Sequence, residues 1–163
     1  MTEPKPENND WWRGCAIYQV YPRSFQDTTG DGLGDLRGVI QRIPYIAELG
    51  VDAIWLSPFY TSPQTDFGYD ISGHFDVAPE YGTLADCRRL IDEVHARGMK
   101  IVLDMVMNHT SAQHPWFLES QSSRMSPRRD WYLWRDGRGR RQQRPPNNWR
   151  SMLGGSGWQR DPQ

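Results

Sequence analysis

The stretch that most constrains the fold runs from Lys100 to His109 and reads KIVLDMVMNH. It begins apolar and partly β-branched and ends polar, which is typical of a buried parallel strand with functional groups at its carboxyl end. In strand alternation Asp104 and Asn108 share one face, and His109 follows at the rim. α/β folds place their chemistry at such rims. Alternatively, Asp104 and Asn108 only fix the strand end, and His109 is a loop residue.

Two more strands are predicted before this one, at residues 15–21 and 51–58, and the third covers 100–108. Helices are predicted between them, from 36 to about 49 and from 83 to 98, because apolar residues recur there at helical spacing and a glycine follows each run. Strand, helix, strand, helix, strand at this spacing predicts two right-handed crossovers and a parallel sheet.

A proline and a capping box mark features of the two predicted helices. Pro44 lies inside the first and should kink it or mark its true start. Thr83 and Asp86 form a capping box for the second. The apolar stripe of this second helix is predicted to be buried and comprises Leu84, Cys87, Leu90, Ile91 and Val94.

Residues 27–38, DTTGDGLGDLRG, repeat an aspartate every four residues with glycines between. Calcium loops alternate inward-pointing oxygen ligands around a glycine turn and add a backbone carbonyl. The spacing predicts a calcium site, with Gly38 where an EF-hand has its bidentate Glu, so the loop is not an EF-hand. The alternative is a Gly/Asp turn without an ion. The candidate ligands are Asp27, Thr29, Asp31, the carbonyl of Leu33 and Asp35.

Two other segments look functional. The loop 59–70, FYTSPQTDFGYD, brings Asp66, Tyr69 and Asp70 together on a turn that contains glycine. Residues 110–163 are rich in Trp, Pro, Gly and Arg without a regular period, which indicates a functional insertion or a disordered tail. The arginines of this segment come without a stacking or groove-binding module, so no nucleic-acid partner is expected.

The composition adds few constraints. The net charge of −1 gives no field that would attract nucleic acid or an anionic membrane. Cys15 and Cys87 are expected to be reduced thiols, and His109 and His114 are too few for zinc. His74 and His95 are expected to be solvated or structural.

The sequence also bears on the location of the protein. Residues 1–10 are expected to be a disordered lead-in without an export signal, and no run is long enough to span a membrane. A cytoplasmic location is therefore expected. The oligomeric state stays open.

Three segments together resemble the α-amylase superfamily of glycoside hydrolases, whose members are (β/α)₈ barrels: WWRGCAIYQVYPRSF, GYDISGHFDVAPEYGTLAD and DMVMNH. Within it, DTTGDGLGDLRG, HPWF, DWYLW and PPNNWRSMLGGSGW are similar to the bacterial α-glucosidase and oligo-1,6-glucosidase group. The resemblance implies an α/β fold: about three βα units of a TIM barrel at residues 11–107, and the start of the loop-rich insertion domain, domain B, at 108–163.

The resemblance also implies roles for five rim residues. Asp66 would accept hydrogen bonds from the hydroxyls of the non-reducing-end glucose, Tyr69 would stack on that ring, and His109 would donate a hydrogen bond that strengthens in the transition state. Asp104 and Asn108 would hold the rim in shape. The substrate would be an oligosaccharide or another α-glucoside.

The resemblance implies a calcium ion in the loop 27–38, where Thr29 stands in place of the family's usual Asn.

The family's nucleophile Asp follows the fourth barrel strand, and its acid/base Glu follows the fifth. Both are therefore expected beyond residue 163, and the chain alone is expected to be inactive. The alternatives are a non-catalytic remnant, a glucosidase-like interaction subunit, or a relative of trehalose synthase or sucrose isomerase.

Overall fold

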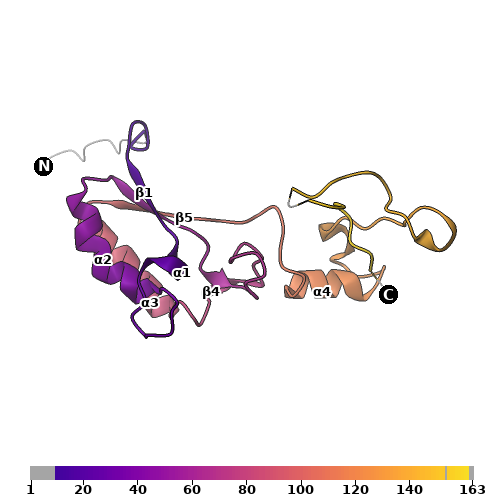
Figure 1. The fold of residues 1–163 in the computed structure, drawn as a ribbon, viewed down its shortest axis with the longest axis horizontal. Helices are drawn as coiled ribbons and strands as arrows, with labels where there is room; N and C mark the ends of the chain where they lie inside the picture. The colour runs from indigo at the N-terminus through magenta and orange to yellow at the C-terminus, as the bar shows by residue number, and fades with distance from the viewer. Residues whose placement is uncertain (1–9, 153, 162–163) are drawn as a thin grey trace, which may run out of the picture. The chain divides into compact units, whose positions relative to one another are not determined.

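The computed structural model describes residues 10–152 and 154–161, which form two compact units. The N-terminal unit extends to Pro115, and the C-terminal unit begins at Trp116 (Figure 1). The sequence predicted the end of the barrel part at residue 107, before this division. No helix in the described ranges combines the length and apolar character needed to cross a membrane.

The N-terminal unit is built on a three-stranded parallel sheet in the order β1-β2-β5. The strands are β1 (Ile17–Val20), β2 (Ala53–Leu56) and β5 (Lys100–Leu103), with Ile17 opposite Ala53 and Ala53 opposite Lys100. The crossovers contain α2 (Leu36–Glu48) and α3 (Leu84–His95), which pack against each other beside the sheet (Figure 1). A short helix, α1 (Pro22–Phe25), follows β1. The predicted strands, helices and parallel pairing are confirmed.

Helix α2 begins at its cap and is anchored by an apolar stripe. The carboxylate of Asp35 accepts a hydrogen bond from the backbone N–H of Gly38 at 2.8 Å, which satisfies one of the free donors at the helix start. The stripe is fully buried and comprises Leu36, Val39, Ile43 and Ile46. Pro44 lies inside the continuous helix on its exposed side, so the alternative that it marks the helix start is wrong.

Helix α3 begins with the predicted capping box. Thr83 Oγ1 accepts from the N–H of Asp86 at 3.2 Å, and Asp86 Oδ2 accepts from the N–H of Thr83 at 2.9 Å. Arg37 on α2 donates to Asp86 at 3.0 Å, and this bond, with those from Thr83, lowers the pKa of Asp86. One residue of the predicted stripe was wrong: Leu84 is 41% exposed, because it lies in the first turn, where the cap turns it away from the core.

The third sheet strand is shorter than predicted. The ladder ends at Leu103, with one more bond from the N–H of Asp104 to Leu56 O at 3.0 Å, whereas residues 100–108 were expected to be extended. The neighbouring strand ends at Leu56, and Pro58 beyond it has no N–H to donate. Met107 is consequently 85% exposed.

Several elements were not predicted, among them the short helix α1. A small antiparallel pair, β3 (Tyr60–Thr61) and β4 (Gly73–Val77), brackets the loop that carries Asp66 and Tyr69. Helix α4 (Pro115–Ser122) lies in the segment that was expected to have little regular structure. Its sequence, PWFLESQS, lacks the apolar period of the other helices, which is why periodicity did not find it.

The C-terminal unit is held together by aromatic rings and arginines. Phe117 of α4 stacks on Trp134, with ring centroids 5.6 Å apart, and Trp134 Nε1 donates to Ser120 Oγ at 2.8 Å. The guanidinium of Arg129 lies 3.9 Å from the centroid of the Trp134 ring, and that of Arg128 lies 4.2 Å from Trp131. Two 3₁₀ turns, Arg129–Trp131 and Arg140–Gln142, complete the unit's regular structure among its described residues.

Gly38 provides a test of how α2 is seated. A Cβ at this position would lie 2.0 Å from the carbonyl oxygen of Gln26, which is backbone and cannot swing away. We therefore expect Gly38→Ala to lower the free energy of unfolding by about 3 kcal/mol, the upper range for overpacking, measured by urea denaturation. The exposed Glu48→Ala on the same helix serves as the control. A Gly38→Ala protein as stable as the control would contradict this packing.

Candidate active-site rim

The carboxyl ends of the three parallel strands meet at one edge of the sheet. Beyond β2, the N–H of Ser57 donates to Val20 O of β1 at 3.0 Å, and the side chain of Ser57 accepts from Gln19 Nε2 at 3.2 Å. Asp104, just after β5, continues the ladder on the other side of β2. Parallel strands bring their last residues to the same edge, so this edge collects polar groups from all three strands.

Tyr69 joins this edge from the loop between β3 and β4. Its hydroxyl donates to Asp104 Oδ2 at 3.3 Å. Burial raises the pKa of Tyr69, and the negative charge of Asp104 raises it further, so the phenol keeps its proton at neutral pH. The structure therefore brings Tyr69 and Asp104 together, although 35 positions separate them in the chain.

Asp70 organises the turn that carries Asp66. Its carboxylate accepts three bonds, from Ser62 Oγ at 2.8 Å, the N–H of Thr65 at 2.9 Å and the N–H of Asp66 at 3.1 Å. Burial alone would raise the pKa of Asp70, yet these hydrogen bonds outweigh it and hold the pKa below the ordinary 3.8. The carboxylate of Asp66 accepts no hydrogen bond from the described residues, so both of its oxygens can receive donors from a ligand.

The same turn contains unusual backbone conformations. Gln64 and Phe67 have left-handed φ angles of 60° and 52°, and such strain is common at binding loops. Tyr21, just after β1, donates its hydroxyl to Phe67 O at 3.1 Å, and the buried Tyr81 donates to Gln64 Oε1 at 3.2 Å. Sequence reasoning missed Tyr21 as a support of this loop; its position at the carboxyl end of the first strand was the available signal.

His109 and Asn108 are exposed, and their side chains make no hydrogen bond or ion pair with the described residues. They follow Asp104 by a few residues, but no hydrogen bond or ion pair joins either of them to Asp66 or Tyr69 among the described residues. The structure thus groups Asp66, Tyr69 and Asp104 through a braced loop and leaves His109 on the nearby segment with both ring nitrogens available.

Within the predicted calcium loop, backbone N–H groups already occupy the carboxylate of Asp27. Asp27 Oδ1 accepts from the N–H groups of Thr29 and Gly30 at 2.8 and 2.7 Å, and Oδ2 accepts from Gly32 at 2.8 Å. These bonds lower the pKa of Asp27, with the one from Gly32 first. Asp35 Oδ1 caps α2, and its Oδ2 accepts from the N–H and the hydroxyl of Thr28 within the loop, both at 2.8 Å.

As arranged, this donor set does not fit a calcium ion. The described residues contain no group of three or more His, Cys, Asp or Glu side chains that could hold a metal. Cation binding would require the carboxylate of Asp27 to exchange its N–H partners for the ion, and Thr29 Oγ1 already donates to Asp27 at 3.2 Å. Calcium stays a prediction from the sequence.

His74 and His114 form a histidine pair. His74 Nδ1 on β4 and His114 Nε2 lie 3.2 Å apart, and His114 is only 4% exposed. The sequence predicted a solvated or structural role for His74 and too few histidines for zinc. No third ligand joins the pair within the described ranges.

Asp70 is the residue to test for loop bracing. Asn keeps one acceptor oxygen and loses the charge, so we expect Asp70→Asn to cost about 1 kcal/mol of unfolding free energy at pH 7. Because the folded pKa of Asp70 is lowered, its contribution is present above pH 4 and is lost as the pH falls through the folded pKa. The difference between the two proteins in urea denaturation should therefore shrink in acid. Asp92→Asn, at an exposed position on α3, is the control; a difference that persists unchanged in acid would contradict the assignment.

Calcium binding is tested separately. If the loop 27–35 binds calcium, millimolar calcium raises the thermal unfolding midpoint, because a ligand that binds only the folded state stabilises it. Asp31→Asn should then abolish the rise, since the Asp31 carboxylate bonds only to the N–H of Leu33 among the described residues and is available as a ligand. A midpoint that is the same in calcium and in chelator would sink the prediction.

Comparison with known proteins gives the family. The model of the alpha amylase catalytic domain matches residues 19–163. A probable alpha-glucosidase of Rhizobium meliloti is 57% identical over 95% of the chain, and a trehalose-6-phosphate hydrolase of Escherichia coli is 57% identical over 91%. The chain spans 28% and 26% of the length of these two relatives.

Solved structures support the same family assignment. A trehalulose synthase variant superposes with a TM-score of 0.89 at 51% identity, covering 93% of this chain and 27% of that one. The trehalose-6-phosphate hydrolase of Bacillus licheniformis gives 0.86 at 50% identity, covering 91% and 26%. The sheet and its crossovers are the N-terminal part of a TIM barrel, which confirms the predicted fold class. The chain belongs to the alpha-amylase family of glycoside hydrolases.

Proposed function

We propose that this chain supplies the glucose-binding rim of an α-glucosidase, which releases terminal glucose from short α-glucosides with retention of configuration. The observation that carries the proposal is the braced loop that presents Asp66 and Tyr69 beside Asp104 at the carboxyl edge of a parallel sheet. The relatives named above act on glucosyl bonds, which supports the same class of substrate here.

Each rim residue has a role that its chemistry supports. The carboxylate of Asp66, with both oxygens available among the described residues, would accept hydrogen bonds from two sugar hydroxyls. The ring of Tyr69 would pack against the apolar face of the glucose, with its hydroxyl tied to Asp104 so that the ring cannot turn away. His109 would donate a hydrogen bond to the same sugar, and this bond would strengthen as the transition state forms.

Cleavage itself needs two further groups. Retaining hydrolysis uses a carboxylate nucleophile and a carboxylic acid about 5 Å apart. The family resemblance assigns these to the ends of the fourth and fifth barrel strands. The rim of this chain would bind and orient the sugar, and the two carboxylates would carry out the chemistry, so the activity proposed is that of the assembled barrel.

The proposal extends to the layout and location of the protein. We assign residues 11–107 to the first part of the catalytic barrel and 108–163 to the start of domain B. The division between compact units at Pro115 falls within the second range.

Both cysteines are free thiols, which supports a reducing, cytoplasmic setting.

One alternative has a specific observation in its favour. The trehalose-6-phosphate hydrolase is as similar to this chain, at 57% identity, as the probable alpha-glucosidase. Enzymes with the same glucose-binding rim can differ in the group attached to that glucose. A phosphorylated disaccharide is therefore the second candidate substrate.

The test uses the protein as its source cells make it, purified and first weighed as an intact mass. We expect hydrolysis of a chromogenic α-glucoside, and Asp66→Ala should lower kcat/KM by about 100-fold, since hydrogen bonds to a charged group contribute 1.5–3 kcal/mol each. The exposed Asp92→Ala should leave kcat/KM unchanged. Cleavage of trehalose 6-phosphate without cleavage of the glucoside would select the second candidate, and cleavage of neither would refute both.

A further inference from the structure

A hollow of about 430 Å³ lies within the C-terminal unit and is lined by residues from 145–150 and 155–156. These residues come from the two arms of the segment PPNNWRSMLGGSGW. The two arms of this segment are held together by antiparallel backbone bonding between Arg150 and Ser156 and by the N–H of Gly157, which donates to Trp149 O at 2.8 Å. The volume is within the range of small-molecule sites. Its lining includes Pro145, Asn147, Asn148, Trp149, Arg150 and Ser156.

Trp149 is a fixed aromatic platform in this lining. Its ring stacks on Trp158 with centroids 5.5 Å apart and planes only 14° from parallel. Asn147 Oδ1 accepts from Trp158 Nε1 at 2.6 Å and from the N–H of Trp149 at 3.1 Å, so one amide holds both tryptophans. Trp158 covers one face of the Trp149 ring, and Trp149 is nevertheless 56% exposed. An exposed indole face of fixed orientation binds a flat apolar surface at little entropic cost.

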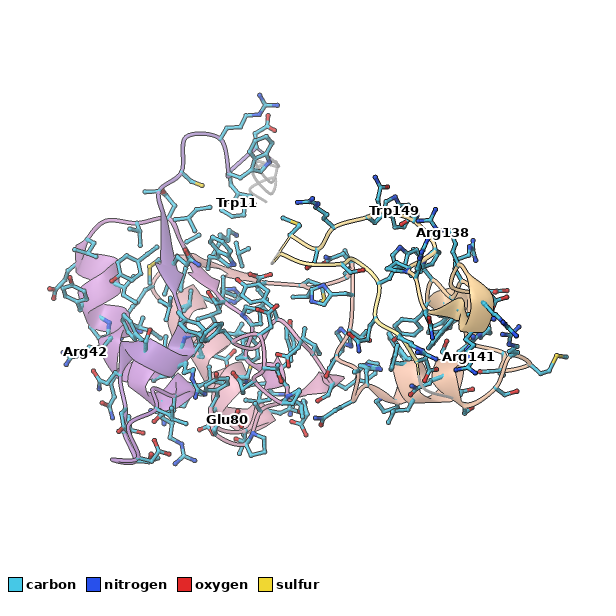
Figure 2. The ribbon with its side chains drawn as sticks, turned by 45° about the vertical axis from the view of Figure 1, so that its right-hand side comes forward. Trp11, Arg42, Glu80, Arg138, Arg141 and Trp149 are labelled. Atoms are coloured by element: carbon cyan, nitrogen blue, oxygen red, sulfur yellow. The ribbon has the colours of Figure 1, made fainter. Side chains whose placement is uncertain are left out.

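The charge around the hollow has one sign. Arg150 is the only charged residue in the lining, and Arg138 donates its Nε to the carbonyl of Pro145 at 3.1 Å, which places a second guanidinium at the edge. Neither arginine forms an ion pair with the described residues. Figure 2 shows Trp149 and Arg138 at the surface of this unit. Residues 116–163 contain ten arginines and four acidic residues, so the surroundings also favour an anion.

We propose that this hollow binds a phosphorylated sugar. A pyranose ring presents C–H groups on one face, which fit the exposed face of Trp149, and hydroxyls at its edge, which suit the amide of Asn148. A phosphate on the ring would accept hydrogen bonds from Arg150 and Arg138, because guanidinium forks match phosphate oxygens. A neutral sugar would leave both guanidinium groups unpaired, and free phosphate would leave the indole face uncovered. The lining contains none of the rim residues, and the proposal does not depend on the proposed hydrolysis.

The experiment is a titration of the full chain followed by two-dimensional NMR of its indole N–H groups. Each of the eight tryptophans gives one signal, and Trp149→Phe and Trp158→Phe assign the two that matter. With glucose 6-phosphate, we expect the signals of Trp149 and Trp158 to shift and the other six to stay. The dissociation constant should be at least tenfold lower than for glucose or for inorganic phosphate alone.

Variants separate the two halves of the proposed site. Trp149→Ala should weaken glucose 6-phosphate binding about tenfold, read from the signal of Trp158. Arg150→Gln should reduce the preference for the phosphorylated over the neutral sugar about tenfold, the equivalent of 1.4 kcal/mol. Arg135→Gln removes an exposed arginine outside the lining and should change neither.

Three outcomes would overturn the inference. Equal affinity for glucose and glucose 6-phosphate would remove the role of the arginines. Equal affinity for inorganic phosphate would reduce the site to a simple anion site. Equal weakening by Arg135→Gln and Arg150→Gln would attribute the binding to net charge. A failure of hydrolysis in the native protein would refute the proposed function and leave these NMR results unaffected.

Discussion

The candidate rim depends on the carboxylate of Asp70. It binds a hydroxyl and two backbone N–H groups from the preceding residues, so a single side chain closes the turn on which Asp66 stands. Tyr21 supports the same turn through a hydrogen bond to Phe67 O. The turn includes left-handed residues that it would not adopt without such support. The proposed binding of a sugar would therefore rest on hydrogen bonds that the sugar itself does not touch.

The sheet determines where this turn can act. Three parallel strands end at one edge, and the carboxylate of Asp104 at that edge receives the hydroxyl of Tyr69. Helix α2 packs closely against the segment that follows α1. Gly38 allows α2 to approach the carbonyl of Gln26, and Asp35 closes the helix start. The edge is thus positioned by rigid elements, and the groups proposed to bind the sugar come from the loop attached to it.

Much of the fold could be predicted because it is encoded locally. Hydrophobic periodicity identified α2 and α3, and the capping box at Thr83 gave the start of α3. The end of β5 at Leu103 could not be predicted, because it depends on where its neighbour β2 stops pairing. Within the candidate site, Asp104 was singled out from its place at a strand end and Asp66 and Tyr69 from their turn, and the family resemblance supplied their expected roles. The bracing by Tyr21 depends on chain segments 46 positions apart. Periodicity carries no information about such contacts.

The C-terminal unit differs from the N-terminal unit in how it is stabilised. Among its described residues only Ser120 is fully buried, and no aliphatic side chain is. Its contacts are ring stacks and arginines over rings, such as Arg129 on Trp134. Unfolding it exposes less new apolar surface per residue, so its heat-capacity change is small and its stability varies little with temperature. On cooling, when hydrophobic burial weakens, the N-terminal unit loses more of its stability, so the balance between the two units shifts with temperature.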